Sequence, residues 1–491
     1  MKKILYAMMV LAMVFALSAC GKGGNQEENP SGGPSSEAGA FRAGFARNDC
    51  MPDESVPLRG YGNVMMRMSD GYLDILQVSC IAITDETGNT ALLLSTDMCG
   101  SSWCKEVREN ISKELNVPME NIHLTATHTH SSIAYEKADS VSAVKNFMDK
   151  IKVVSLETAR QAMEERKPAE MYWGVVDLDG YNFVRHYKLA NGEIVGDNFG
   201  KDTGEYVGYS TEENHLMQVL QFKRAEGEKD IFFTNWRAHA HITGGSSKTN
   251  ISADFPYTFR MNVEKQLDCY LAYYQGDSGN SNPYTRWAAD GVDGVTYSGQ
   301  ITRDYKVYGK QIADIFVETY NKGFEKVGEG TGLIKAKMQV FTGDVNHEDD
   351  YLITDARVVQ ECWSTTGSSS SAMALDTTGK IRSVYHAGSI CSKVNMPQTM
   401  DEEIFSLQIG EAGFVFVPNE IFVENGNFVR DNSPYKYQFY VGYSDDSKSY
   451  IPSQWGYDYK CYECCTGNYA PGTGEKLADT LVGMLKELKG N

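Results

Sequence analysis

The sequence predicts an α/β fold in which layered, mixed β-sheets are flanked by helices and a metal site lies at the ends of strands. Strand-like and helix-like patterns alternate along the chain, and some consecutive strands are joined as hairpins. A purely parallel, doubly wound sheet would not contain such hairpins. The position of the site is suggested by His and Glu residues that directly follow three apolar runs.

The expected elements begin with a hairpin over Ile75–Met98, where apolar and polar residues alternate around turn residues 86–89 (Glu-Thr-Gly-Asn). A helix over Ser101–Leu115, a strand over Ile122–Ala126 and a helix over Val141–Glu164 follow. Met171–Leu178 is expected to be the next strand. This order of hairpin, helix and strand is typical of layered α/β proteins.

Further along, Met217–Ala238 is expected to form two strands joined at Arg224–Lys229. A helix is predicted over Phe255–Ala272, with Asp254 as its N-cap and Pro256 in its first turn. The remaining expectations are a helix (Tyr305–Phe324), two strands (near Leu333–Val340 and Phe405–Val417), a closing helix (Leu477–Leu488) and a loop at Ser364–Ser371.

The N-terminus predicts export and lipid attachment. A basic start (Lys2, Lys3) precedes an apolar run over Ile4–Leu17 that is too short for a spanning helix. Residues 17–20 (Leu-Ser-Ala-Cys) are similar to a bacterial lipobox, in which the thiol of Cys20 would receive the lipid. We therefore expect a signal peptide at 1–20 and an extracytoplasmic protein anchored to the bacterial cell membrane. The alternative is an ordinary secretory signal with a chance cysteine.

Residues 21–40 are rich in Gly, Ser, Asn, Glu and Pro, which is typical of a flexible tether. Residues 41–491 show no convincing internal break and are expected to form one domain. The formal net charge of −19 argues against binding to nucleic acid or to anionic headgroups through the overall field of the protein.

The chain has 11 cysteines, and outside the cytoplasm those other than Cys20 could pair. The sequence does not say which of them pair. Residues 461–465 (Cys-Tyr-Glu-Cys-Cys) suggest a zinc site, but a structural site needs a second ligand pair, and no matching cysteine pair exists elsewhere in the sequence.

Candidate metal ligands follow three apolar runs. His128 and His130 follow Ile122–Ala126, His239 and His241 follow the run that ends at Ala238, and Glu420 follows residues 414–417. Catalytic zinc typically takes three protein ligands from His and carboxylate, plus water. Residues i and i+2 of an extended chain share a face, so one His of each pair could bind the metal while the other orients a ligand or binds substrate. Ordinary hydrogen-bonded histidines are the alternative.

These blocks also carry a resemblance to the neutral, non-lysosomal ceramidase family, limited to its catalytic region. The order and spacing of six short segments are similar to that family: residues 57–62 (Pro-Leu-Arg-Gly-Tyr-Gly), 121–130 (Asn-Ile-His-Leu-Thr-Ala-Thr-His-Thr-His), 238–239 with 250–254 (Asn-Ile-Ser-Ala-Asp), 274–276 (Tyr-Gln-Gly), 417–420 (Val-Pro-Asn-Glu) and 450–452 (Tyr-Ile-Pro). The Thr-His-Thr-His block is the most specific of them.

The resemblance implies zinc-dependent hydrolysis of an amide bond, with an N-acyl lipid such as ceramide as substrate. It implies that the metal ligands are His128, His239, Glu420 and Tyr450. It further implies that His130 assists proton transfer, that Arg185 contacts the substrate, and that Tyr450 or Arg185 steadies the oxyanion.

The sequence departs from the family around the expected pocket. The family's active-site Ser falls on Asn282, so a serine nucleophile is not expected, although Asn282 could hydrogen-bond a substrate amide. Two loops, at 131–134 and 244–247, also differ. The alternatives are therefore the same zinc chemistry on another N-acyl or peptide-like substrate, or a lipoprotein that binds a ligand without catalysis. Ser-His-Asp catalysis is disfavoured because the chain lacks a Gly-x-Ser-x-Gly motif.

Overall fold

The computed structural model describes residues 39–62, 66–196, 206–245, 247–283, 304–328 and 332–490. The expected signal peptide, its Cys20 and most of the expected tether lie outside these residues. Within them, no helix is both long and apolar enough to cross a membrane.

The largest element of the fold is a nine-stranded mixed sheet with the order β14-β12-β11-β6-β1-β3-β4-β5, and β16 pairs with β6 beside this path. Neighbouring strands are antiparallel except for β4–β5 and β12–β14, which are parallel. The strands are β1 (Arg42–Asp49), β3 (Gln77–Thr84), β4 (Thr90–Thr96), β5 (Ile122–Ala126), β6 (Lys167–Asp177), β11 (Leu216–Arg224), β12 (Ile231–Trp236), β14 (Tyr270–Gln275) and β16 (Glu325–Lys326).

This sheet turns back on itself where β1 meets β6, because only two residue pairs join those strands. The two halves then face each other. The Ser95 hydroxyl of β4 donates to the carbonyl of Tyr273 at 2.6 Å, and the Tyr274 hydroxyl of β14 donates to the carbonyl of Leu93 at 2.7 Å. The bend brings the strands at the two ends of the order, β5 and β14, into contact.

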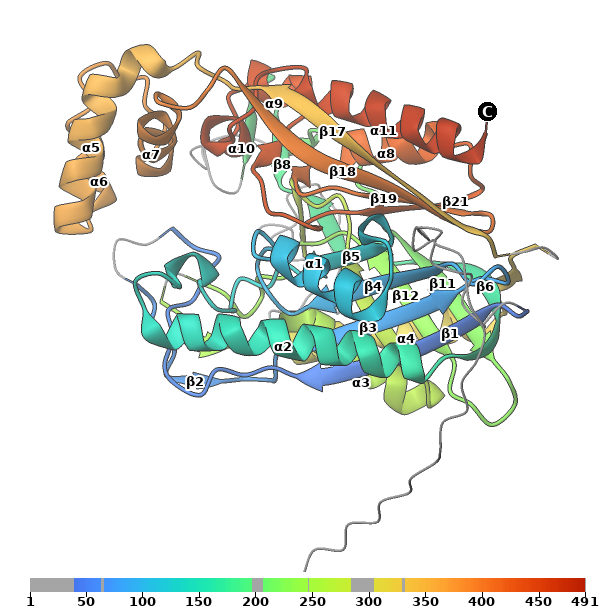
Figure 1. The fold of residues 1–491 in the computed structure, drawn as a ribbon. Coiled ribbons are helices and arrows are strands. Elements are labelled where there is room, and N and C mark those ends of the chain that lie inside the picture. Colours follow the sequence, from blue (N-terminus) through green and yellow to red (C-terminus); the bar gives the residue numbers. More distant parts are fainter. Residues whose placement is uncertain are drawn as a thin grey trace, which may run out of the picture. The chain divides into compact units, whose positions relative to one another are not determined.

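A four-stranded sheet packs on the nine-stranded one. Its order is β17 (Ile334–Asp344), β18 (Thr399–Ile409), β19 (Ala412–Phe416) and β21 (Tyr437–Val441). Phe233 of β12 packs edge-on against Phe414 and Phe439, with ring centroids 5.4 Å apart in each pair. Helices α8 (Val423–Asn432) and α11 (Thr473–Lys489) cover the other face of the small sheet (Figure 1). The result is a layered α/β fold with mixed sheets, as predicted.

Helices also cover the large sheet. In α2 (Ser142–Glu164) the buried residues Val144, Phe147, Met148 and Ile151 recur at i, i+3, i+4 and i+7, so one apolar stripe faces β1 and β3. Helix α1 (Cys104–Leu115) packs beside α2. Helices α3 (Asp254–Leu267) and α4 (Tyr305–Asn321) share a core with β11, β12 and β14.

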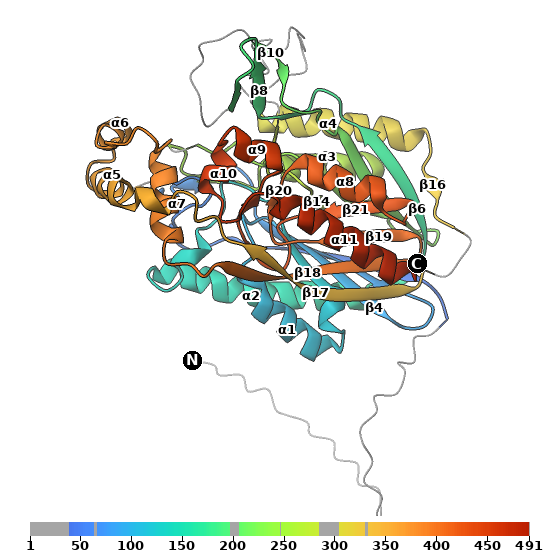
Figure 2. The same cartoon turned by 90° about the horizontal axis from the view of Figure 1, so that it is seen from above.

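The remaining elements are short. Figure 2 shows β8 and β10 rising from the edge of the molecule above α4, and Figure 1 shows α5, α6 and α7 grouped to one side of the sheets. These elements are β2 (Gly71–Tyr72), β7 (Asn182–Val184), β8 (His186–Leu189), β9 (Ile194–Gly196), β10 (Tyr206–Tyr209), β13 (Asn250–Ile251), β15 (Ser281–Pro283), β20 (Glu420–Ile421), β22 (Tyr450–Ile451), α5 (Ile353–Thr366), α6 (Ser369–Met373), α7 (Val384–Lys393), α9 (Gln454–Asp458), α10 (Tyr462–Thr466) and 3-10 turns at Met119–Asn121, Tyr135–Lys137 and Asp350–Leu352.

The helix predicted over Phe255–Ala272 was too long. It ends at Leu267, where Asp268 adopts a left-handed backbone with φ 48°, and β14 begins at Tyr270. Asp254 is not the N-cap. Ala253 holds that position, and the Asp254 carboxylate accepts from the backbone amides of Thr243 and Phe255 instead. The Asp254 carboxylate therefore binds the loop that follows β12 and does not cap α3.

Two other segments also differ from the prediction. The single strand expected over Phe405–Val417 is the end of β18 and all of β19, because Gly410 with φ 59° reverses the chain between them. The loop expected over Ser364–Ser371 is helical at both ends. Helix α5 continues to Thr366, and α6 starts at Ser369 with the Ser368 hydroxyl as its cap.

Candidate metal centre

His128 lies two residues after the end of β5, and both its backbone conformation and one hydrogen bond fix its ring. Its φ of 63° is left-handed, a conformation that is uncommon for a residue with a side chain. The Nδ1 atom donates to the carbonyl of Cys99 at 2.7 Å. That bond fixes the tautomer and leaves Nε2 with its lone pair, which is the form in which a histidine binds a metal.

His239 lies three residues after the end of β12, and a hydrogen bond to a backbone carbonyl holds its ring as well. Its Nδ1 donates to the carbonyl of Ser281 at 3.0 Å. Its Nε2 is fully buried and has no hydrogen-bond partner among the described residues. A buried polar atom without a partner is costly, so this nitrogen is an indication of a missing ligand.

Glu420 completes the group from β20, just after β19. Its Oε2 lies 3.5 Å from Nε2 of His128 and 3.3 Å from Nε2 of His239. Zinc bonds of about 2.0–2.2 Å in a tetrahedral arrangement separate ligand atoms by about 3.4 Å. The three donor atoms lie within 4.8 Å of one another, so these residues could hold a metal ion, and their chemistry fits the zinc that the sequence predicts.

The protonation states favour cation binding. Burial lowers the pKa of His128 and of His239 to about 3 in each case, so both imidazoles are neutral at neutral pH. Neutral imidazoles bind a metal without first releasing a proton. The Glu420 carboxylate beside them supplies negative charge.

His130 and His241, the second histidine of each pair, lie next to this group. Nε2 of His130 is 3.0 Å from Nε2 of His128, and its ring centroid is 5.8 Å from that of His241. Burial lowers the pKa of His130 well below its ordinary value and that of His241 to about 3. Both imidazoles are therefore neutral at neutral pH, and each lies on the same side as its partner histidine, as the i, i+2 spacing predicted.

Two solved structures have a fold similar to that of this chain. One is the neutral ceramidase from Pseudomonas aeruginosa, with a TM-score of 0.66 and 15% identity over 92% of this chain and 75% of that one. The other is a ceramidase complexed with C2, with a TM-score of 0.67 and 17% identity over the same shares of the two chains. The chain has the neutral ceramidase fold. No protein-family model and no curated protein sequence matches it.

In this neutral ceramidase fold, two tyrosines adjoin Glu420. Tyr450 pairs with it in the parallel β20–β22 bridge. Tyr443, which the sequence did not single out, donates from its hydroxyl to Oε2 of Glu420 at 3.3 Å and stacks near the His128 ring. Burial raises the pKa of both phenols well above the ordinary value, so each is a hydroxyl donor at neutral pH.

Arg185 and Asn282 meet on the other side of Tyr450. The Arg185 guanidinium lies 5.7 Å from the Tyr450 ring centroid, and its Nη1 donates to Oδ1 of Asn282 at 3.4 Å. Its Nε donates to Glu463 at 2.6 Å, and Glu463 also accepts from His186 at 3.0 Å. Burial acts to lower the pKa of Arg185, but Glu463, Tyr450 and Glu420 together outweigh burial and raise that pKa well above its ordinary value. The Arg185 guanidinium is thus fixed in place.

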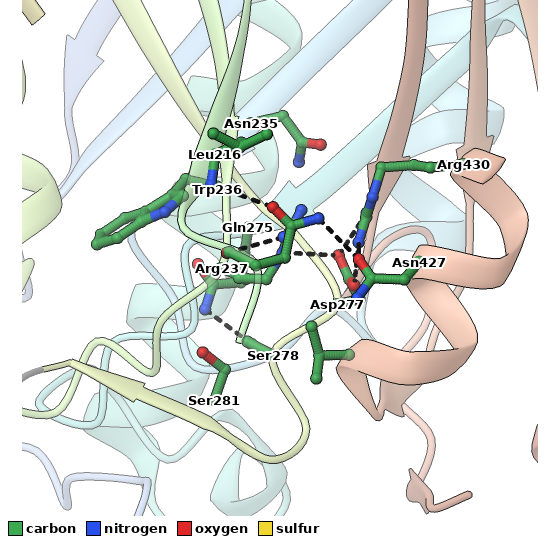
Figure 3. Close-up of polar contacts among 12 residues, drawn as sticks. Leu216, Asn235, Trp236, Arg237, Gln275, Asp277, Ser278, Ser281, Asn427 and Arg430 are labelled. Carbon is green, nitrogen blue, oxygen red and sulfur yellow. Dashed lines mark hydrogen bonds and ion pairs between the residues drawn. The ribbon is translucent and has the colours of Figure 1, made fainter. Parts of the chain in front are cut away.

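A buried ion-pair network of Arg237, Asp277 and Arg430 lies next to the segment that carries His239 (Figure 3). Asp277 accepts from Arg237 at 3.2 Å and from both terminal nitrogens of Arg430 at 2.7 and 2.9 Å. Arg237 immediately precedes Ala238 and His239, and Ser278 follows Asp277 and contacts Tyr443 at 2.9 Å. The network therefore fixes the loop carrying His239 to the loop that holds the Tyr443 hydroxyl.

Another histidine of the 121–130 segment, His123, has a separate role. His123 lies within β5, hydrogen-bonds Asp445 at 2.8 Å and stacks on Phe416 at 3.7 Å, so it belongs to the core. Sequence reasoning missed Tyr443 and Glu463. Glu463 lies between Cys461 and Cys464. The cysteine pattern of 461–465 suggested a zinc site, and nothing local in the sequence indicated that this carboxylate pairs with Arg185.

Proposed function

We propose that the protein is a zinc-dependent hydrolase of an amide bond, acting on an N-acyl lipid such as ceramide. The convergence of His128 and His239 Nε2 with Glu420 Oε2 is the observation that carries this proposal. The neutral ceramidase fold supports the reaction class and a lipid amide as substrate.

His128, His239 and Glu420 would hold the ion, and Tyr450 is proposed as its fourth ligand, as the sequence resemblance implies. When bound, zinc lowers the pKa of a coordinated water to about 7 and polarises a carbonyl oxygen. The partly buried carboxylate and the two neutral imidazoles supply the charge and lone pairs that such an ion needs.

His130 is proposed as the general base and acid. Its imidazole is neutral and adjacent to His128, so it can accept a proton from the attacking water. The protonated His130 imidazole then gives that proton to the nitrogen of the leaving amine, because the amine cannot depart as an anion. His241 and Asn282 lie beside this path and would orient the substrate amide.

Arg185 and Tyr450 are proposed to stabilise the oxyanion that develops on the carbonyl oxygen. Both are protonated donors in a buried site, where a hydrogen bond to negative charge is stronger than in water. Because Glu463 fixes Arg185, this donor needs little reorganisation during the reaction.

Two other functions stay as alternatives. The first is the same chemistry on another N-acyl or peptide-like substrate, which the departures at Asn282 and in the loops favour. The second is a lipoprotein that binds a ligand without catalysis. Purified protein with about one zinc per chain that releases fatty acid from N-acyl substrates supports hydrolysis, whereas metal-free protein that binds ligand tightly supports the receptor.

The first test is metal content. His128→Ala and Glu420→Ala should each lose the zinc and the activity, because each removes one donor of the group. His347→Ala is the matched control, since His347 hydrogen-bonds Asp350 at 2.7 Å in a separate place and should keep both. Elemental analysis of the purified variants measures the result, and full zinc in both site variants would refute the assignment.

A further inference from the structure

Two cysteine sulfurs lie very close together near the candidate metal centre. The Sγ atoms of Cys461 and Cys464 are 2.9 Å apart, and both side chains are buried. The neighbouring Cys465 points elsewhere, since its sulfur contacts the carbonyl of Lys460 at 3.5 Å. The pair therefore consists of Cys461 and Cys464 specifically.

The surroundings of the pair are apolar on one side, and His186 and Glu463 adjoin Cys461 on another. The two sulfurs share a cluster with Phe422, and Trp455 and Tyr457 pack against it. Gly456 lies against both sulfurs, because a Cβ atom at that position would be 3.1 Å from each of them. A side chain at position 456 would therefore press on both sulfurs, and the glycine there leaves space for them.

A zinc ion does not suit this pair. Two thiolates on one tetrahedral zinc, with bonds of about 2.3 Å, lie about 3.8 Å apart, well beyond the observed separation. The nearby carboxylate is also already in use, since Glu463 is ion-paired with Arg185 at 2.5 Å and with His186 at 3.0 Å. A covalent bond between the sulfurs explains their separation better than a shared cation.

We propose that Cys461 and Cys464 form a disulfide that clamps the turn carrying Glu463 and thereby fixes Arg185. Glu463 lies inside the four-residue loop that the bond would close, and its carboxylate holds the guanidinium. The bond itself is independent of the proposed function, whereas its effect on turnover rests on that function.

The bond would form by exchange with a small-molecule disulfide. One cysteine thiolate attacks the donor disulfide and releases a thiol, which leaves a mixed disulfide on the protein. The second cysteine thiolate attacks that mixed disulfide and releases the second thiol, so the donor gains two electrons and two protons. Access is available because Cys461 lines a cavity of about 630 Å³ together with His186, Tyr462 and Arg382.

The first experiment uses the full-length protein and oxidised glutathione. After alkylation without reductant, trypsin releases residues 461–476 as one peptide that contains all three cysteines. We expect a single alkyl group, on Cys465, and three alkyl groups after dithiothreitol. The bond should survive in the matched control Cys465→Ser and be lost in Cys461→Ser and Cys464→Ser. Three alkyl groups in the oxidised protein, or a bond that includes Cys465, would overturn the proposal.

The second experiment measures turnover of an N-acyl substrate. Reduction should lower kcat about threefold to tenfold with unchanged zinc content, because Arg185 then loses its fixed position. Cys464→Ser should show the low value with or without reductant. Equal turnover of oxidised and reduced protein would overturn the clamp. If no form hydrolyses any amide, the proposed function fails, and the peptide mass still decides whether the bond exists.

Discussion

At the scale of single residues, the two histidines of the Thr-His-Thr-His block have different environments. His128 is held by the Cys99 carbonyl and faces Glu420, whereas Nδ1 of His130 is buried without a hydrogen-bond partner among the described residues. The first histidine is therefore held in one orientation, as its proposed role as a ligand requires, and the second is less constrained. This difference separates binding of the metal from proton transfer.

His130→Ala tests that separation. The variant should keep its zinc, because His128, His239 and Glu420 are all present, and kcat should fall about 10²–10⁴-fold, which is the range for removal of a general acid–base. Zinc analysis and steady-state kinetics on the same preparation provide the measurement. Release of the zinc from this variant would mean that His130 is itself a ligand.

The sequence could predict His128, His239 and Glu420 because each follows an apolar run that had to be buried. The contacts of Tyr443 could not be predicted in this way. It follows Gly442 in a turn with φ 53°, and its hydroxyl reaches Glu420 only because β19 and β21 are parallel neighbours. Such a pairing is long-range and leaves no local periodicity.

At the scale of elements, the short strand β20 is positioned by a close backbone contact. The Gly279 amide donates to the carbonyl of Ile421 at 2.8 Å, and a Cβ atom at 279 would collide with the backbone of Glu420 and Ile421. Because residue 279 has no side chain, the backbone of β20 can approach it this closely. This contact helps to position the Glu420 carboxylate.

Gly279→Ala should displace Glu420, destabilise the protein by about 1–3 kcal/mol and reduce zinc affinity, as overpacking does in a rigid core. Gly483→Ala is the matched control. Gly483 lies inside α11 with no atom near the new methyl group, so this change should stabilise by about 0.5–1 kcal/mol. Urea unfolding and zinc titration of both variants give the answer, and equal effects would contradict the contact argument.

The contact between β8 and α10 predicts a pH dependence of stability. Burial acts to lower the pKa of His186, but Glu463 outweighs it and raises the pKa to about 10, with Cys461, Phe422 and Trp455 also facing the ring. A raised folded-state pKa stabilises fully below the unfolded value of about 6.5, and this stabilisation is lost as pH rises toward 10.

His186→Gln should therefore lose stability relative to the wild type at pH 6, and the difference should shrink by about 2–3 kcal/mol between pH 6.5 and 9. Urea unfolding at several pH values measures both curves. Parallel curves would show that the His186–Glu463 pair does not carry a charge in the folded protein.

Sequence periodicity predicted the long helices and the β3–β4 hairpin but not β14 or the α5–α7 group. Tyr270–Gln275 follows α3 after a two-residue link, so an apolar strand looked like the continuation of an apolar helix. In α5 and α6 the Ser- and Thr-rich composition resembled a loop, and only a small core around Val359 and Ile390 makes those helices stable.

At the scale of the whole molecule, the export and lipid anchor are proposals that concern residues outside the described part of the chain. Cys20→Ser removes the thiol that would receive the lipid. We expect the variant protein to move from the membrane to the soluble fraction, because acyl chains hold a protein by burying methylene groups. Fractionation of cells that produce both forms measures this, and a membrane-bound variant would contradict the anchor.

The three donors of the candidate centre come from the chain just after β5 and just after β12, in the two halves of the bent sheet, and from β20, which lies between β19 and β21 of the small sheet in the chain. An unfolded chain consequently has no preformed place for an ion, and loading becomes the last step of maturation. With the proposed zinc and the proposed export, the cation would be selected by the compartment in which the chain folds, not by the one in which it is synthesised.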